Sequence, residues 1–186
     1  YDPVKKQDQT VAAVSFTQAD IDKIKKVENV KDVLAVYIPV PEYVTKDGQK
    51  KYSVTSLDQN VDGFETPLAV GRAPVRTKNE EILLSYQYLA PLGFSKPEDA
   101  LNQKIKIAFK DITGKITETE YTITGVLVNS LTGSLIRVNV IELERQAKLQ
   151  LKSDPGAYAL VALTDPKLEE SKFEKVKADL LLLSGM

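Results

Sequence analysis

The segment AVGRAPVRTKNEEILLSYQYLAPLGF, residues 69–94, governs how the rest of the chain is interpreted. It combines a Gly-Arg pair, a polar loop, a short apolar run and two tyrosines. The run EILLS, residues 81–85, predicts a strand, and YQYLAPLG, residues 86–93, predicts a short helix that Pro91 and Gly93 help to end. A charged loop beside glycines invites a catalytic interpretation, which requires residues that transfer protons or attack a substrate.

The composition removes many residues of that kind. The chain contains no cysteine and no histidine, which excludes disulfides, thiolate nucleophiles, histidine-based triads and the usual zinc sites. A hydrolase would therefore have to use carboxylates or a Ser-Lys pair. The absence of cysteine is also compatible with an exported domain that avoids oxidation.

Length and charge narrow the class of protein further. The 186 residues suffice for one sizeable domain or two small ones. With 25 basic and 26 acidic residues, the net charge of -1 does not attract nucleic acid or an anionic bilayer. No apolar run of about eighteen residues and no signal peptide are visible. The start at Tyr1 suggests a piece excised from a longer protein.

Strand and helix patterns alternate near both ends of the chain. Residues 1–10 are polar and expected to be flexible, and VAAVSF, residues 11–16, predicts a buried strand. Thr17 and Asp20 form a variant capping box that predicts a helix start. Near the other end, a buried strand over residues 157–163 precedes a long amphipathic helix.

The middle of the chain predicts paired strands. Residues 33–44 are rich in β-branched and aromatic side chains, and Pro39 and Pro41 place part of this strand at an edge or a bulge. The segments 104–110 and 116–128 alternate around a turn and predict a hairpin.

These patterns predict an α+β fold. A body of β-α-β units is expected from both terminal parts, residues 11–58 and 121–186. A smaller mixed α/β lobe, residues 59–120, is inserted in the middle, and residues 1–10 form a flexible N-terminal segment.

One polar segment partly matches a calcium-binding loop. Positions one, three, five and six of such a loop are occupied by Asp58, Asn60, Asp62 and Gly63. Position twelve, which requires a bidentate carboxylate, is Ala69, and Glu65 stands at position eight. We therefore expect a polar turn and no metal. No Walker loop or other phosphate-binding motif is present, and no cofactor is expected.

The remaining candidates for chemistry match no motif. No pair of acidic residues stands out from the charged faces of helices and hairpins. Ser85 and Lys78 could be imagined as a Ser-Lys dyad, but Ser85 is better explained as the end of a strand or the cap of a helix at Tyr86. Tyr86 and Tyr88 cannot share one helix face, so at least one is expected to be exposed. No catalytic, cofactor-binding or metal-binding residue is predicted.

Taken together, the motifs resemble the extracytoplasmic core domain of MacB-like ABC transporter permeases, the FtsX/LolE-type family. TQADIDKIKKVENVKDVLAVY, residues 17–37, looks like the family's helix followed by a strand. DGFETPLAVGRAPVRTKNEEILLSYQYLAPLGF, residues 62–94, is similar to its strand, Gly-Arg pair, acidic loop, apolar strand and small helix. ALNQKIKIAFK with EYTITGVL looks like the next strand pair, although Gln103 and Lys104 replace the usual Gly-Lys.

This resemblance answers the question raised by residues 69–94. It implies that Gly71, Arg72, Gly93, Gly125 and Val126 are scaffold positions, with the first and third providing backbone freedom at turns. It also implies a porter-like body with an inserted lobe.

The resemblance further implies a noncatalytic domain outside the bacterial cytoplasmic membrane, between the first two membrane helices of a permease. Such a domain relays ATP-driven motion and engages exported substrates or partner proteins. The expected partners are the parent permease with its ATP-binding subunit, a second permease in a dimer, and an exported peptide, lipoprotein or cell-wall protein. The alternatives are a free cell-surface binding or adhesion module and, third, a carboxylate-based hydrolase.

A domain inserted between membrane helices must return its chain to the membrane. We therefore expect Val11 and Leu183 to lie on one side of the body, within about 20 Å, half the span of a compact chain of this length.

Overall fold

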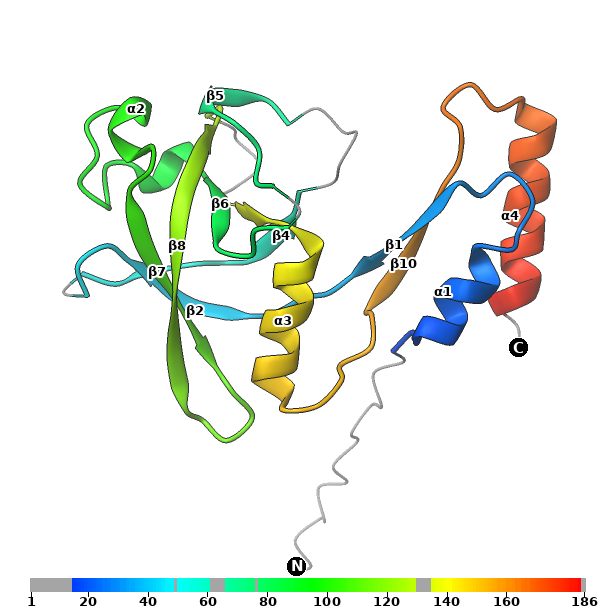
Figure 1. The fold of residues 1–186 in the computed structure, drawn as a ribbon, viewed down its shortest axis with the longest axis horizontal. Coiled ribbons are helices and arrows are strands. Elements are labelled where there is room, and N and C mark those ends of the chain that lie inside the picture. Colours follow the sequence, from blue (N-terminus) through cyan, green and yellow to red (C-terminus); the bar gives the residue numbers. More distant parts are fainter. Residues whose placement is uncertain (1–14, 49, 61–65, 76, 130–134, 185–186) are drawn as a thin grey trace, which may run out of the picture.

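The computed structural model describes residues 15–48, 50–60, 66–75, 77–129 and 135–184. These residues form two parts, which we call the small body and the lobe (Figure 1). The principal contacts of the elements in each part are with other elements of the same part. The chain has an α+β fold, as the sequence predicts.

The small body is built from the two ends of the chain. It contains α1 (Gln18–Ile24), β1 (Asp32–Val36), β10 (Ala159–Leu163) and α4 (Glu170–Ser184). The two strands pair antiparallel, and α1 packs beside α4, where Lys175 Nζ lies 2.6 Å from Glu28 Oε2. Asp20 accepts hydrogen bonds from the backbone N–H and the hydroxyl of Thr17, so the predicted start of α1 is confirmed.

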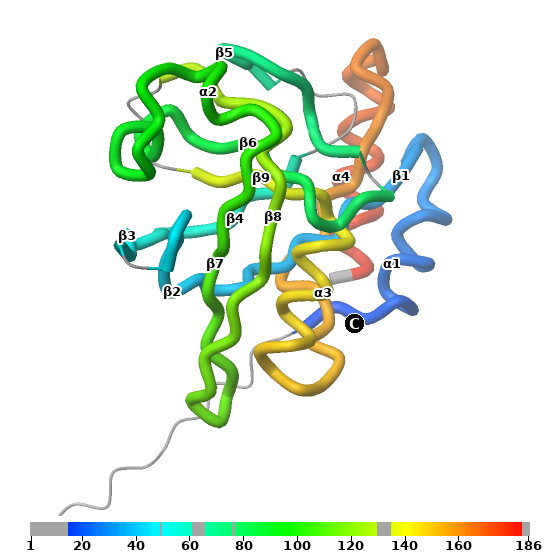
Figure 2. The backbone as a smooth tube through the Cα atoms, turned by 60° about the vertical axis from the view of Figure 1, so that its left-hand side comes forward, coloured from blue at the N-terminus to red at the C-terminus, as the bar shows by residue number. Residues whose placement is uncertain are grey.

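The lobe is built around one large mixed sheet. Its strands are β2 (Pro41–Thr45), β3 (Tyr52–Ser53), β4 (Leu57–Gln59), β5 (Leu68–Gly71), β6 (Glu81–Leu84), β7 (Lys104–Lys110), β8 (Ile116–Leu127) and β9 (Ile136–Val138). They are ordered β3-β2-β7-β8-β6-β9-β4, with β5 also paired to β8. The lobe's helical elements are η1 (Tyr86–Tyr88), α2 (Pro97–Ala100) and α3 (Val140–Leu151). Helix α3 lies on the side of the lobe that faces the small body (Figures 1 and 2).

Strand alternation in the hairpin β7-β8 explains the lobe's core. Ile105 pairs with Tyr121 and Ile107 pairs with Thr119, so these side chains point to one face of the sheet. That face is buried, since Ile105, Ile107 and Tyr121 have no exposed surface. The predicted hairpin is confirmed.

The strand predicted over residues 33–44 is divided between the two parts. β1 ends at Val36 and pairs with β10, whereas β2 begins at Pro41 and pairs with β3 and β7. Proline has no backbone N–H, so Pro39 and Pro41 favour a break here. The predicted bulge is also found, as a register shift between Pro41 and Tyr43.

The predicted domain boundaries fall inside the lobe's sheet. The boundary between residues 58 and 59 lies within β4, and that between 120 and 121 lies within β8. The division of the chain stays a prediction, and strand pairing favours limits in two connecting segments, 37–40 and 152–156. We call these segments the junction.

The start of α1 and the end of α4 both lie at the lower edge of the small body in Figure 1, with the start of α1 nearer the junction, where Phe16 pairs with Ala157. The last turn of α1 and the residues after it face the end of α4 across a shallow cleft. Its lining includes Lys26, Val27, Leu182 and Leu183. Val11, which the predicted distance involves, lies outside the described residues, as does most of the strand predicted over residues 11–16. Its last residue, Phe16, pairs with Ala157.

Candidate functional surfaces

The polar segment that partly matches a calcium loop is engaged in other contacts. Asp58 Oδ2 lies 3.3 Å from Arg137 Nε, an ion pair outside hydrogen-bond geometry. Asn60 Oδ1 accepts a hydrogen bond from the Thr66 hydroxyl at 3.3 Å. The other matching residues, Asp62, Gly63 and Glu65, lie outside the described residues. A cation beside Asp58 favours a turn closed by side chains over a calcium site.

The Ser-Lys dyad is not assembled. Ser85 is buried directly after β6, whereas Lys78 is exposed and its ammonium lies 3.6 Å from Glu81 Oε1. Ser85 occupies the N-cap position of η1, as predicted, but its hydroxyl makes no capping hydrogen bond. The position of Ser85 therefore favours a structural role over a catalytic one.

The two tyrosines of η1 behave as predicted. Tyr86 is 39% exposed, while Tyr88 is buried. The Tyr88 hydroxyl donates a hydrogen bond to the Ser53 carbonyl oxygen at 3.0 Å, which ties η1 to β3. Only Tyr86 of this pair is available to a partner.

The Gly-Arg pair holds strands together. Gly71 has φ +90°, and a Cβ there would lie 2.6 Å from the Cα of Gly125 on β8. Arg72 makes two hydrogen bonds to Glu81, of 2.8 and 2.7 Å, and the Val75 N–H donates to Glu81 at 2.8 Å. The Arg72 guanidinium lowers the pKa of Glu81 to about 2. These contacts close the loop between β5 and β6, in keeping with scaffold roles for Gly71 and Arg72.

The other scaffold positions agree with this picture. Gly93 has φ +80°, which L side chains rarely adopt, and Val126 is fully buried. The glycines beside the charged loop therefore serve the backbone.

A buried polar network fixes α3 to the sheet. Glu142, in the first turn of α3, is fully buried and accepts hydrogen bonds from the Tyr121 hydroxyl, from Gln146 Nε2 at 2.8 Å and from Arg145 at 2.7 Å. Burial, together with the charge of Glu142, raises the pKa of Tyr121 above its usual value of 10.0. Each charge and hydroxyl has a partner, so the network orients the helix.

Glu142 was not predicted as a buried residue, because acidic residues on a helix usually lie on its solvated face. A local signal existed. Asn139 caps α3 by accepting from the Glu142 N–H at 2.9 Å, and the cap residue also donates to the Lys78 carbonyl oxygen at 2.9 Å. An Asn three residues before a Glu is typical of a helix start. The partner of this glutamate, Tyr121, lies on β8 and is 21 positions away in the sequence.

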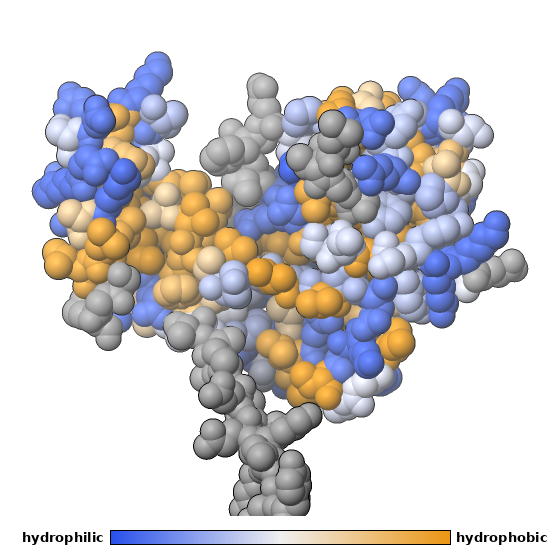
Figure 3. Space-filling view, turned by 180° about the vertical axis from the view of Figure 1, so that it is seen from behind, coloured by the Kyte–Doolittle hydropathy of each residue, from blue (hydrophilic) through white to orange (hydrophobic). Residues whose placement is uncertain are grey.

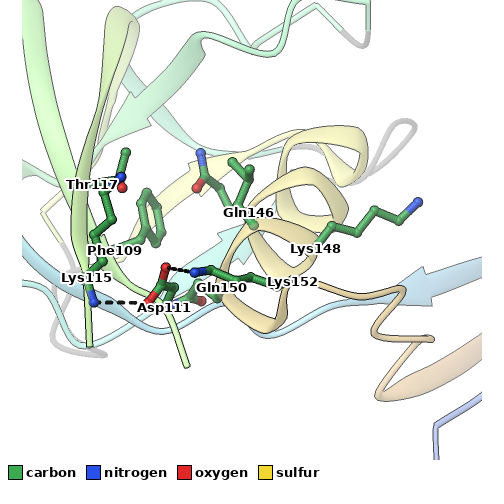
Figure 4. Close-up of a pocket in the computed structure, with 9 residues that line it drawn as sticks. Phe109, Asp111, Lys115, Thr117, Gln146, Lys148, Gln150 and Lys152 are labelled. Carbon is green, nitrogen blue, oxygen red and sulfur yellow. Dashed lines mark hydrogen bonds and ion pairs between the residues drawn. The ribbon is translucent and has the colours of Figure 1, made fainter. Parts of the chain in front are cut away.

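A cleft of about 270 Å³ lies between the β7-β8 hairpin and the second half of α3 (Figure 4). Phe109 and Leu149 supply its apolar lining, and Lys115, Lys148 and Lys152 lie around it. The carboxylate of Asp111 is already occupied by contacts within the protein. Hydrogen bonds from the Thr113 hydroxyl and from Lys152 hold its pKa below the usual range. The cleft offers hydrocarbon and lysine ammonium groups, with no nucleophile and base arranged for catalysis.

Apolar side chains gather over the small body when the molecule is viewed from behind (Figure 3). Val161 of β10 is 45% exposed and Leu182 of α4 is 73% exposed. Ile38 and Val40 of the junction are also exposed. Exposed apolar surface of this kind is typical of contact with other macromolecules.

Metal binding and membrane insertion can be judged for the part of the chain that the structure describes. No group of three or more acidic side chains there could hold a metal ion. No helix there has the length and apolar character needed to cross a bilayer.

No family model and no curated protein matches the chain. Solved structures do. The extracellular domain of the ABC-type transporter YknZ from Gram-positive bacteria matches with a TM-score of 0.62 at 16% identity, over 92% of this chain and 83% of that one. A domain of a protein described as a permease, from Porphyromonas gingivalis, matches with a TM-score of 0.54 at 14% identity, over 93% and 70%. The chain therefore has the fold of permease extracellular domains, and the predicted resemblance is confirmed at that level.

Proposed function

We propose that the chain is a noncatalytic extracytoplasmic domain of an ABC transporter permease in the bacterial cytoplasmic membrane. It would relay conformational change driven by an ATP-binding subunit and engage an exported substrate or partner protein. The observation that carries this proposal is the match to the YknZ extracellular domain over almost the whole chain. Fold alone does not define function, so the geometry has to be compatible with that role.

The arrangement of the chain ends supports insertion between membrane helices. The start of α1 and the end of α4 both lie at the lower edge of the small body in Figure 1, and the lobe lies beside the small body. A chain that enters and leaves on the same side can return directly to the bilayer. The lobe would then be held beside the small body, outside the membrane, where it could meet exported partners.

The division into two parts supports a mechanical role. Membrane helices that moved would act on α1 and α4 directly, and the lobe would follow through the junction. Within the lobe, an eight-stranded sheet and the buried network around Glu142 favour movement as one unit.

The polar clusters support a noncatalytic role. Glu81 is held by Arg72, and Glu142 by Tyr121 and Arg145, so both acids are satisfied by the protein. Catalytic carboxylates instead face a substrate and carry pKa values matched to proton transfer.

The complete reading frame tests the proposal most directly. We expect four membrane helices, with this domain between the first and second, and an adjoining gene for an ATPase. A secreted reading frame without membrane helices would refute the permease and favour a free surface module.

Topology provides a second test in the complete protein. Glu98 of α2 is exposed, and this chain has no cysteine, so Glu98→Cys introduces a single thiol into the domain. A membrane-impermeant maleimide should label this thiol in intact cells whose outer envelope has been removed to expose the cytoplasmic membrane. The unsubstituted protein is the control. Labelling only after lysis would contradict an extracytoplasmic location.

A further inference from the structure

The two parts are connected by the junction, and one side chain of the lobe holds the first junction segment. Gln150, in the last turn of α3, is half-buried. Its Oε1 accepts from the Val40 N–H at 2.8 Å, and its Nε2 donates to the Val40 carbonyl oxygen at 2.8 Å. The amide of Gln150 therefore pairs with both backbone groups of Val40, as a neighbouring strand would.

The same amide reaches the β7-β8 hairpin. Gln150 Nε2 also donates to the Lys110 carbonyl oxygen at 3.0 Å. In addition, the backbone carbonyl oxygen of Gln150 accepts a hydrogen bond from the Ile112 N–H at 2.9 Å. Both amide protons and the amide oxygen of the side chain are thus engaged. Three segments meet at this residue: the first junction segment, the hairpin and the end of α3.

An ion pair between Lys152 and Asp111 fixes the start of the second junction segment. Lys152, which follows α3, has φ +53° and ends the helix. Its ammonium lies 2.9 Å from Asp111 Oδ2 and donates to the Thr113 hydroxyl at 3.2 Å. Both junction segments are therefore attached to the same hairpin of the lobe.

We infer that Gln150 is a positioning residue that sets the orientation of the small body relative to the lobe. Only an amide of this length supplies one acceptor and two donors to Val40 and Lys110 together. Because the bonds are partly exposed, water can replace them, and the joint can open without unfolding either part. The use of this joint in relaying motion rests on the proposed function, whereas the joint itself does not.

A distance measurement between the two parts tests the inference. Spin labels are placed on Glu98→Cys in the lobe and Lys172→Cys in α4, two exposed positions in a chain without other cysteines. Electron–electron double resonance should give one narrow distance distribution for the parent chain. Gln150→Ala should broaden it, with the undocked fraction rising on the order of tenfold, the effect of losing one to two net hydrogen bonds.

Two further variants identify the cause. Gln150→Glu keeps the size and the acceptor but loses both donors, so it should broaden the distribution as well. Gln103→Ala removes an exposed glutamine far from the junction in sequence and should leave the distribution narrow. A second pair of labels within the lobe, at Glu98→Cys and Ile116→Cys, should report no change in any variant.

Two results would overturn the inference. Unchanged distributions in both Gln150 variants would show that other contacts, such as the packing of Tyr37 against the lobe's core, set the orientation. Equal broadening of the label pair within the lobe would show that Gln150 stabilises the lobe itself. Neither result depends on whether the complete protein is a permease, which the reading frame and the labelling in cells decide.

Discussion

The lobe and the small body are built from similar alternating patterns but bury them to very different degrees. In the lobe, Ile82, Ile107 and Ile123 are among many side chains without exposed surface. In the small body, burial of apolar side chains is limited to Val33, Ala157 and Val176 among the described residues. A pattern of apolar residues therefore produces a closed core only where enough elements surround it.

The difference follows from the number of layers around each sheet. The lobe's sheet has strands on both sides of β7 and β8 and a helix packed on it. The small body has a two-stranded ribbon, which is marginally stable alone and depends on α1 and α4. We expect the lobe to determine the global stability and the small body to open at lower free energy.

The largest effect is expected from the lobe's core. Ile123→Ala should lower the free energy of unfolding by about 3–5 kcal/mol, because the side chain is fully buried and a cavity remains. Val161→Ala on the exposed strand of the small body should cost about 0.5 kcal/mol or less. Urea unfolding followed by circular dichroism measures both. Equal losses would show that the two parts share one core.

The Gly71 contact provides the next test. Gly71→Ala should destabilise the lobe by about 2–4 kcal/mol, since the residue has φ +90° and its Cβ would meet the backbone of β8. Gly48→Ala is the matched control, with φ +79° and no atom within 4 Å of the new Cβ. The control should lose only about 1 kcal/mol. If thermal unfolding shows the same loss for both, close strand approach is not what requires Gly71.

Acid should weaken the lobe through Glu81. The pKa of this carboxyl is lowered from 4.5 to about 2, so its contribution is present above pH 4.5 and lost as the pH falls toward 2. Glu81→Gln should cost about 1–2 kcal/mol at neutral pH, and the variant should lose less stability than the parent chain on acidification. Parallel stability curves between pH 5 and pH 2 would contradict this role.

In the small body, the effect of a core substitution is expected to stay local. Val176→Ala removes buried methyl groups worth about 1–2 kcal/mol. The loss should appear as faster amide exchange in α1 and α4, with exchange in β7 and β8 unchanged. If exchange rises equally in the lobe, the two parts unfold together.

Much of the local structure could be read from neighbouring residues. The capping box at Thr17, the bulge near Pro41, the β7-β8 hairpin and the exposure of one tyrosine of the pair Tyr86 and Tyr88 were all predicted. Each depends on interactions within a few positions or on strand alternation, which sequence spacing displays directly. The predicted domain boundaries fall within β4 and β8, and the division of the chain stays a prediction.

The surfaces that matter for function depend on contacts between distant residues. Glu142 of α3 can be buried because the hydroxyl of Tyr121, on β8, donates a hydrogen bond to it. Gln150 pairs with Val40, which lies 110 positions away in the sequence. The sequence marks Glu142 only as a residue of a helix start, and it does not distinguish Gln150 from the exposed glutamines around it. Their partners are known only once the strands are paired.

Local chemistry thus determined the start of α1 and the β7-β8 hairpin, and the absence of histidine and cysteine limited what the chain could catalyse. Tertiary structure decided that β1 pairs with β10, that β6 runs parallel to β8, and that Gln150 pairs with Val40 of the junction. The physical reason is the separation along the sequence over which each interaction acts. Capping and alternation act between close neighbours, whereas burial and pairing depend on which distant segments exclude water together.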